Sequence, residues 1–155
     1  MAGVPDTRWF DSPVQRFNRA FARAHHAVVT RTHGRPGHLT PRMRTLVLVT
    51  VGRRSGRQRL ATLVYVAHGG GFLVLATNFG RPHDPGWWHN LRAAPDAEVW
   101  LSGRTMAVHG RELAGAERDA ALAVALAGNA QWRTYFAHVT RPIPVILLEP
   151  PTGEA

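Results

Sequence analysis

The sequence T-V-G-R-R-S-G-R-Q-R, residues 50–59, lies between two runs of apolar residues that favour β-strands. Residues 46–49 read L-V-L-V before it, and residues 60–66 read L-A-T-L-V-Y-V after it. Gly52 and Gly56 bracket the basic connection, and a glycine-bounded connection between two such runs is typical of a β-hairpin. The stretch therefore predicts two antiparallel strands joined by an arginine-rich turn.

The turn also carries groups that bind anions. It holds Arg53, Arg54, Arg57 and Arg59, with Ser55 between the glycines. Arginine forks match phosphate and carboxylate oxygens two at a time, and glycines let backbone N–H groups approach a ligand closely. We interpret the turn as a phosphate or polyanion clamp at the mouth of a β-structure. The alternative, a solvated basic turn, fits this stretch equally well.

Length and composition bound the function class. The chain has 155 residues, 45% of them hydrophobic, which fits one domain with a real core. Its net charge is +9, and every basic residue is arginine, so an anionic partner is expected. Cysteine is absent, which excludes disulfides, thiolate catalysis and cysteine-type zinc or iron–sulfur sites. The nine histidines show no metal-binding spacing, so no metal site is expected.

The first 40 residues predict an amphipathic helix and a linker. Ser12-Pro13 is a helix start, with a hydroxyl N-cap before proline at the first helical position. One apolar stripe follows it: Phe10, Val14, Phe17, Phe21, Ala24 and Val28. Arg16, Arg19, Arg23 and His26 lie off this stripe. We expect the helix, residues 13–29, to dock on its own domain by the stripe; the alternative is weak, salt-sensitive association with an anionic membrane surface.

No signal-peptide pattern occupies residues 1–20, and no stretch approaches the ~20 apolar residues that span a bilayer. The expected location is the cytoplasm, with the membrane surface as a peripheral alternative. The expected division is 1–40 for the helix and linker, 41–150 for the main domain, and 151–155 for a tail.

The sequence of the main domain predicts mainly β-structure with helices: an α+β fold with about six mostly antiparallel strands. The strands are expected near residues 43–50, 60–67, 72–76, 97–101, 104–113 and 145–148. Short helices are expected at 85–94, 115–127 and 129–139. Tight turns such as Ser102-Gly103 favour antiparallel neighbours, and this pattern fits a small closed or half-open barrel.

Two further groups carry candidate chemistry. Residues 76–80, A-T-N-F-G, with Trp87, Trp88, His89 and Asn90, can present polar groups to a heterocycle edge and aromatic rings to its face. The alternative is that one tryptophan and Leu91 plug the barrel end. Tyr65, Trp132 and Tyr135 can line an apolar substrate pocket, with phenols as donors, or form ordinary aromatic core.

Taken together, four motifs resemble the deazaflavin-dependent nitroreductase family. They are L-V-L-V-T-x-G-R-R-S-G-x-x-R (46–59), A-T-N-F-G (76–80), P-G-W-W-H-N-L-R-A-x-P (85–95) and T-R-x-I-P-V (140–145), in the family's order and spacing. The resemblance implies a split β-barrel related to the flavin mononucleotide-binding barrels. It also implies coenzyme F-420, a deazaflavin with a phosphate and a polyglutamate tail, as cofactor; flavin mononucleotide is the alternative.

The resemblance assigns roles to individual residues. It implies that Arg54, Ser55, Gly56 and Arg59 hold the phosphate, with Arg53 and Arg57 near the acidic tail. The implied ring contacts are Ala76, Thr77, Asn78 and Phe79, with Trp88 and Asn90 as buttresses, and Thr62 and Leu63 are further cofactor-binding residues. The implied substrate pocket is Tyr65, Trp132, Tyr135 and Phe136. Two departures from the family stand out: Thr62 replaces a frequent proline, and the C-terminal segment has few tyrosines.

The implied function is hydride transfer from the reduced coenzyme to a small acceptor such as a quinone, enone or nitroaromatic. We expect Tyr135, the single tyrosine in residues 129–139, to donate the proton that hydride transfer then requires. The alternatives are a non-catalytic coenzyme or lipid carrier and a flavin mononucleotide-binding barrel protein. Nucleic-acid binding is not expected, because the arginines cluster in one turn without interleaved aromatics. A monomer and a homodimer are both compatible with the sequence.

Overall fold

The arginine-rich turn connects two paired strands, as predicted. The computed structural model describes residues 9, 11–40 and 43–151. Strand β2 (Met43–Val51) pairs antiparallel with β3 (Gln58–Val64), and Val51 lies opposite Gln58. The turn is closed by hydrogen bonds from Gly52 N–H to the Arg57 carbonyl at 2.8 Å and from Gly56 N–H to the Gly52 carbonyl at 2.8 Å. Gly56 has φ 69°, a conformation that favours glycine.

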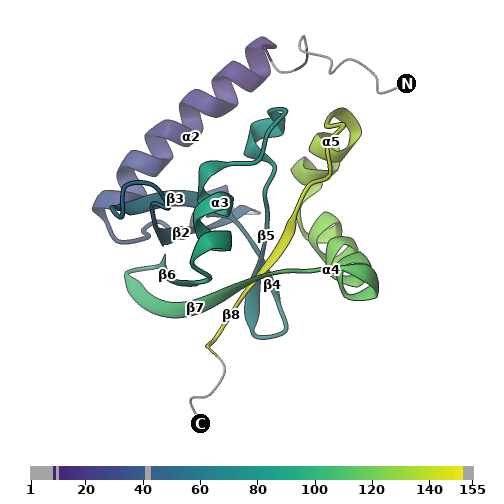
Figure 1. Ribbon diagram of the computed structural model, residues 1–155. Helices are drawn as coiled ribbons and strands as arrows, with labels where there is room; N and C mark the ends of the chain where they lie inside the picture. Colours follow the sequence, from purple (N-terminus) through teal and green to yellow (C-terminus); the bar gives the residue numbers. More distant parts are fainter. Residues whose placement is uncertain (1–8, 10, 41–42, 152–155) are drawn as a thin grey trace.

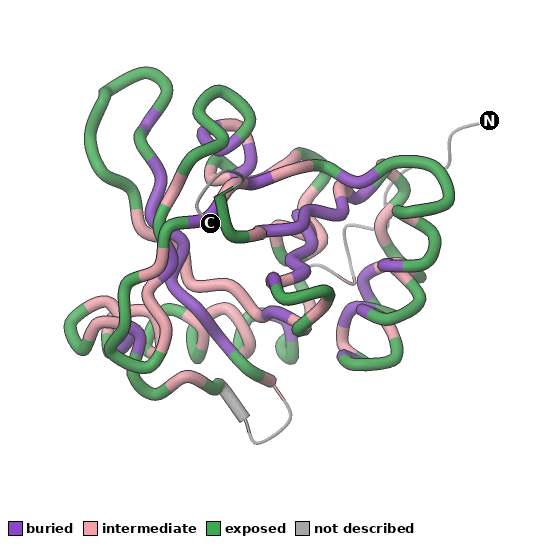
Figure 2. Tube along the Cα trace, turned by 90° about the horizontal axis from the view of Figure 1, so that it is seen from below, coloured by how far each residue is buried: buried purple, intermediate pink, exposed green. Residues whose placement is uncertain are grey.

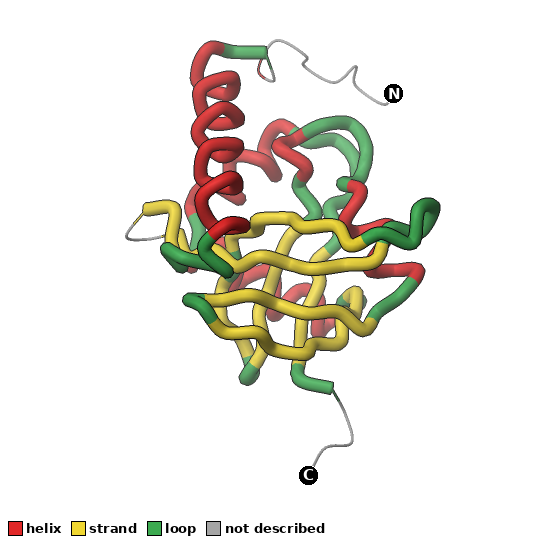
Figure 3. The backbone as a smooth tube through the Cα atoms, turned by 90° about the vertical axis from the view of Figure 1, so that its left-hand side faces the viewer, coloured by secondary structure: helices red, strands yellow, loops and turns green. Residues whose placement is uncertain are grey.

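One bent strand closes the sheet into a barrel. Beyond Tyr65, β3 continues as β4 (Val66–His68), which pairs with β5 (Gly71–Leu75) instead of β2. The remaining strands are β6 (Asp96–Leu101), β7 (Arg104–Glu112) and β8 (Val145–Glu149), and the sheet order is β2-β6-β7-β8-β5-β4. Every pairing is antiparallel. Because β3 and β4 supply the two edges of one curled sheet, the fold is a split β-barrel, as Figure 3 shows.

The strands are apolar on both sides where the sheet is covered on both sides. In β2, Leu46 and Leu48 pack inside the barrel, whereas Val47 and Val49 pack outside it with Val29. Such two-sided burial explains why residues 46–49 form a continuous apolar run instead of an alternating one. Strand β8 repeats the arrangement: Ile146 and Leu148 face inward, and Val145 and Leu147 belong to an outer cluster. Figure 2 shows the buried strands running through the centre of the molecule.

Helices close the two open surfaces of the barrel. Helix α3 (Gly86–Ala93) inserts Trp88 and Leu91, which are 2% and 0% exposed, into the inner cluster. This confirms that a tryptophan and Leu91 plug the barrel. Helices α4 (Gly115–Gly128) and α5 (Ala130–His138) cover the outer face of β5 and β8, on the right in Figure 1.

Helix α2 (Pro13–Arg31) lies on the other side of the barrel, but the prediction of its docking face was wrong. The cap is as expected, since the Ser12 hydroxyl accepts from Gln15 N–H at 3.3 Å. However, the stripe is exposed: Val14 is 66% exposed, Phe17 69% and Phe21 47%. The buried residues are Gln15 and Val29. The apolar period locates the apolar face of a helix without stating what that face contacts. Phe10 lies outside the described residues.

Two small elements were not predicted from the sequence. Strand β1 (His38–Thr40) pairs with the start of β2, within the stretch expected to be a linker. A 3-10 turn, η1 (Asn78–Gly80), follows β5. In the part of the chain that the structure describes, no helix is long and apolar enough to cross a membrane.

Candidate functional site

Two adjoining cavities open between the hairpin, α2, α3 and α5. The larger has a volume of about 720 Å³ and the smaller about 390 Å³. Ala61 of β3 and Trp87 of α3 line both, so the two cavities form one continuous site with two compartments. Among the described residues, no aspartate or glutamate lines either compartment.

The smaller cavity, which we call the basic compartment, is built by the hairpin and α3. Arg53, Arg54, Ser55 and Arg59 line it, together with Asn90. Asn90 is buried and joins the hairpin to α3: its Oδ1 accepts from Arg53 N–H and Arg53 Nη1, each at 3.2 Å. Its Nδ2 donates to Thr50 Oγ1 at 3.5 Å. The helix therefore fixes the base of the turn, using one side-chain donor of Arg53 together with its backbone N–H.

The turn leaves no room for side chains at its base. A Cβ atom on Gly52 would meet Ser55 Oγ at 2.6 Å and the Arg57 carbonyl oxygen at 3.3 Å. Gly56 and Arg57 are exposed at the tip and line neither cavity. Of the predicted phosphate and tail residues, the structure thus brings Arg53, Arg54, Ser55 and Arg59 together.

The larger cavity, the apolar compartment, lies between the barrel mouth and α2. Its barrel wall includes Thr62 and Leu63 of β3, and its floor includes Thr77, Asn78 and Phe79. Trp132 and Tyr135 of α5 close one end, and Phe17 and Phe21 of α2 stand at another wall. Seven of the predicted ring and substrate residues meet here: Thr62, Leu63, Thr77, Asn78, Phe79, Trp132 and Tyr135.

Four predicted residues lie behind these walls. Tyr65 is 7% exposed, packs edge-on against Phe72 and belongs to the inner core. Phe136, a residue of α5, packs against the outer cluster. Ala76 and Trp88 are 0% and 2% exposed. None of the four lines either cavity, and for Tyr65 the alternative of ordinary aromatic core is what the structure shows.

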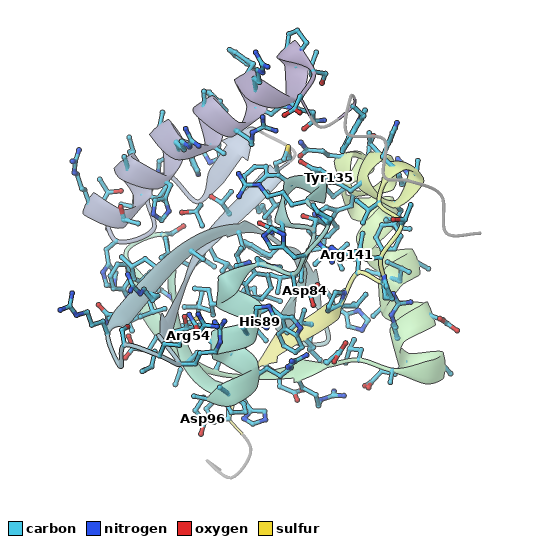
Figure 4. The ribbon with its side chains drawn as sticks, turned by 45° about the horizontal axis from the view of Figure 1, so that its top comes forward. Arg54, Asp84, His89, Asp96, Tyr135 and Arg141 are labelled. Atoms are coloured by element: carbon cyan, nitrogen blue, oxygen red, sulfur yellow. The ribbon has the colours of Figure 1, made fainter. Side chains whose placement is uncertain are left out.

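Arg141 organises the floor of the apolar compartment. Its Nη2 donates to the carbonyls of Ala76 and Thr77, each at 3.0 Å, and its Nε to the carbonyl of Arg81 at 3.0 Å. Its Nη1 contacts Asp84 Oδ1 at 2.7 Å. One guanidinium therefore holds residues 76–84 at four points. Figure 4 shows Arg141 and Asp84 between Tyr135 and the distant Arg54.

The clamped loop adopts an unfavourable backbone conformation. Asn78 has φ 47° and Phe79 has φ 55°, in the left-handed region that residues other than glycine rarely occupy. Such conformations persist where the surrounding structure enforces them, and they concentrate at functional sites. Arg141 lies in the motif T-R-x-I-P-V, but no role was predicted for it from the sequence. Nothing in the local sequence reveals partners about 60 residues away along the chain.

Tyr135 lines the apolar compartment, and its buried environment favours the neutral phenol. It is 5% exposed, and burial raises its pKa to about 12, although the charge of Arg19 acts in the opposite direction. Trp9 packs edge-on against the Tyr135 ring at 5.7 Å. A phenol with this pKa donates a hydrogen bond at neutral pH and gives up its proton reluctantly.

Two histidine–threonine pairs connect α2 to the barrel beside the same cavity. His25 Nε2 lies 3.1 Å from Thr45 Oγ1, and His26 Nδ1 lies 2.7 Å from Thr62 Oγ1. All four residues line the apolar compartment. Burial lowers the pKa of His25, and the charges of His38 and His26 lower it further. The sequence placed His26 off the apolar stripe, but no sequence pattern indicated its contact with Thr62.

Comparisons with known proteins agree on one family. Residues 21–150 match the family model described as F420H(2)-dependent quinone reductase. The F420H(2)-dependent quinone reductase Rv1261c of Mycobacterium tuberculosis is 32% identical over 146 residues, which cover 92% of this chain and 96% of the relative.

Solved structures agree with the sequence matches. An F420-H2 dependent reductase, FDR-A, has a TM-score of 0.62 and 28% identity, over 68% of this chain and 93% of that one. A chain described as a domain-swapped dimer has a TM-score of 0.64 and 26% identity, over 89% of this chain and 100% of that one.

Proposed function

Because the chain belongs to the F420H(2)-dependent quinone reductase family, we propose that its two compartments bind the reduced coenzyme and a quinone-type acceptor side by side. The protein is an oxidoreductase that uses coenzyme F-420 and acts on a small molecule. The observation that carries the proposed arrangement is the continuity of a basic compartment with an apolar one through Ala61 and Trp87.

The residues present fit such a coenzyme. Arg53, Arg54, Arg59 and the Ser55 hydroxyl are donors around a cavity without carboxylates among the described residues, which suits a phosphate. Gly52 lets the turn close tightly, because a Cβ atom there would meet Ser55 Oγ at 2.6 Å. Arg57, at the exposed tip, suits the acidic tail. The apolar compartment suits a planar ring system, held against Thr62, Leu63 and residues 77–79.

When bound, the reduced coenzyme supplies a hydride. The chain's own residues then do three things: they orient, exclude water and handle the proton. Arg141 fixes the loop of residues 77–79, which would hold the ring; Trp132 and Phe79 would form apolar walls, and the neutral Tyr135 hydroxyl would offer a hydrogen bond to the acceptor oxygen. Tyr135 thereby orients the acceptor.

The direct test is binding and turnover with two coenzymes. Coenzyme F-420 should bind more tightly than flavin mononucleotide, since the hairpin has more arginines than one phosphate needs, and fluorescence quenching measures both affinities. Arg54→Ala and Arg59→Ala should each weaken binding by roughly 1.5–3 kcal/mol, the scale of a hydrogen bond to a charged group. Equal or tighter flavin mononucleotide binding would contradict the proposal.

Turnover separates an enzyme from a carrier. Oxidation of the reduced coenzyme should accelerate on adding a quinone, and no acceleration with a panel of quinones and enones would favour the carrier. For the assembly, we propose a homodimer, because a structural relative 26% identical is described as a dimer; light scattering distinguishes it from a monomer.

A further inference from the structure

We propose that His26 and Thr62 form a proton relay that protonates the reduced acceptor, with Thr62 as the catalytic residue that touches it and His26 as the proton source. This inference rests on the proposed function of the same site. It begins with the 2.7 Å contact between His26 Nδ1 and Thr62 Oγ1, which joins α2 to β3 at the wall of the apolar compartment.

The chemistry requires a proton donor at this wall. Hydride transfer to a quinone or enone leaves an oxyanion, which must gain a proton. Catalysis by a general acid is most effective when its pKa lies near the working pH. Tyr135 is poorly matched, because its pKa is raised to about 12. Imidazole is the side chain that ordinarily changes its charge near neutral pH.

The geometry places the His26 imidazole in contact with the Thr62 hydroxyl, which lines the apolar compartment. Both His26 and Thr62 are half-buried and both line the compartment. A threonine hydroxyl can accept from the His26 N–H while donating its own proton to a ligand oxygen. The helix therefore supplies the ionisable group, and the strand supplies the contact with the acceptor.

The step balances in atoms and electrons. The acceptor gains a hydride, with its two electrons, from the reduced coenzyme, which is thereby oxidised. A new O–H bond forms between the acceptor oxygen and the Thr62 proton, while the Nδ1–H bond of the His26 imidazolium breaks to restore the Thr62 hydroxyl. His26 regains a proton from solvent, which receives the proton that the coenzyme releases on oxidation.

The surrounding charges favour the hydride transfer that forms the oxyanion. Arg19, Arg23 and His25 of α2 line the compartment, with Arg81 and Tyr135 from the facing elements. His38 of β1 acts on His25. Because these groups are basic or neutral and no carboxylate of the described residues lines the cavity, an oxyanion formed there is stabilised.

The structure offers matched controls. His33 Nε2 lies 2.6 Å from Thr105 Oγ1, a histidine–threonine pair that lines neither cavity. His33→Gln and Thr105→Val remove the same kind of contact as His26→Gln and Thr62→Val. They report any general cost of losing such a contact between segments.

The first measurement is the pH dependence of turnover with a neutral naphthoquinone. Wild-type turnover should depend on pH, because the relay starts from a proton on His26. His26→Gln and Thr62→Val should lower turnover at pH 6 by about 10²-fold, the lower end of general acid catalysis, and remove the pH dependence. Thr62→Ser should restore most of the rate. The two control variants should keep both the rate and the profile.

The second measurement does not depend on turnover. The probe is 2-hydroxy-1,4-naphthoquinone, an oxyanion at neutral pH that resembles the unprotonated product. Calorimetry in two buffers of different ionisation enthalpy should show proton uptake when it binds to the wild-type protein with oxidised coenzyme. His26→Gln should abolish that uptake, and His33→Gln should not.

The outcomes are distinguishable. If the wild-type protein does not oxidise the reduced coenzyme with any quinone, the proposed function fails. If it does, but His26→Gln and Thr62→Val keep the pH profile and the proton uptake, the relay alone is overturned. If His26→Gln does not fold, Thr62→Val, which keeps the helix sequence intact, decides the question by the same two measurements.

Discussion

At the scale of residues, the burial of Tyr135 bears on the role of proton donor that the sequence predicts for it. A tyrosine on the segment after the long helix suggested a proton donor, but a raised pKa stabilises the neutral phenol. A raised pKa also makes the unfolding free energy depend on pH. The stabilising contribution of Tyr135 is present below the ordinary pKa of tyrosine and is lost as pH rises through the raised pKa.

The unfolding free energies of the wild-type protein and of Tyr135→Phe should therefore respond differently to alkaline pH. Between about pH 10 and 12, the wild-type unfolding free energy should fall by up to roughly 2–3 kcal/mol more than that of Tyr135→Phe, since each pKa unit corresponds to about 1.4 kcal/mol. Urea unfolding at several pH values measures it. At pH 6, Tyr135→Phe should raise the KM for the quinone while keeping the pH profile. Loss of that profile would instead make Tyr135 the proton donor.

Arg141 is a positioning residue that sequence alone did not reveal. Its four contacts with residues 76–84 hold Asn78 and Phe79 in left-handed conformations. We expect Arg141→Lys to weaken coenzyme binding by roughly 1.5–3 kcal/mol, because one ammonium cannot replace a planar fork that reaches several acceptors.

The matched control for Arg141 is Arg118, which donates from Nη2 to the Ile143 carbonyl at 3.1 Å and lines neither cavity. Arg118→Lys should affect the melting temperature without changing coenzyme affinity. If Arg141→Lys lowers the melting temperature but leaves the affinity per folded molecule unchanged, Arg141 is structural only.

At the scale of elements, most of the fold was readable from sequence because each strand is bounded by a local signal. Gly69 and Gly70, and Ser102 and Gly103, all have positive φ and make two-residue turns between paired strands. Strand β1 was missed because three residues carry no period. Part of the site could be predicted, because the hairpin is formed by residues close together in the sequence. The contacts of α2 with Thr45 and Thr62 join residues far apart in the sequence and could not be predicted.

Helix α2 provides a direct test of which face docks. Val29 is 1% exposed and packs with Val47 and Val49, so Val29→Ala should lower the unfolding free energy by roughly 1–3 kcal/mol. Phe21→Ala, on the exposed stripe, should stay within about 0.5 kcal/mol of wild type. Denaturant unfolding compares the two. An equal loss for Phe21→Ala would mean that the apolar stripe is the docking face in solution.

At the scale of the whole molecule, helix and barrel share one site. The family match begins at residue 21, inside α2, and His25 and His26 line the apolar compartment. We therefore propose that the expected boundary at residue 40 separates two segments of one working unit. The hairpin and α3 form the basic compartment, and α2 completes the apolar one.

The net charge of +9 should affect the binding of the coenzyme more than the binding of the quinone. In the proposed arrangement, a phosphate with a polycarboxylate tail would meet four arginines in and beside the basic compartment, whereas a quinone in the apolar compartment carries no charge. Salt screens charges at the surface, with a Debye length of ~10 Å at 0.1 M and ~3 Å at 1 M. We expect the Kd of coenzyme F-420 to rise about tenfold or more across this range and the KM of the quinone to change by less than about twofold. Arg57→Ala should reduce the salt dependence for coenzyme with a long tail more than for flavin mononucleotide, which has no tail. Equal salt dependence of the coenzyme Kd and the quinone KM would place the acceptor among the same arginines. That result would contradict the division of the site into a basic and an apolar compartment.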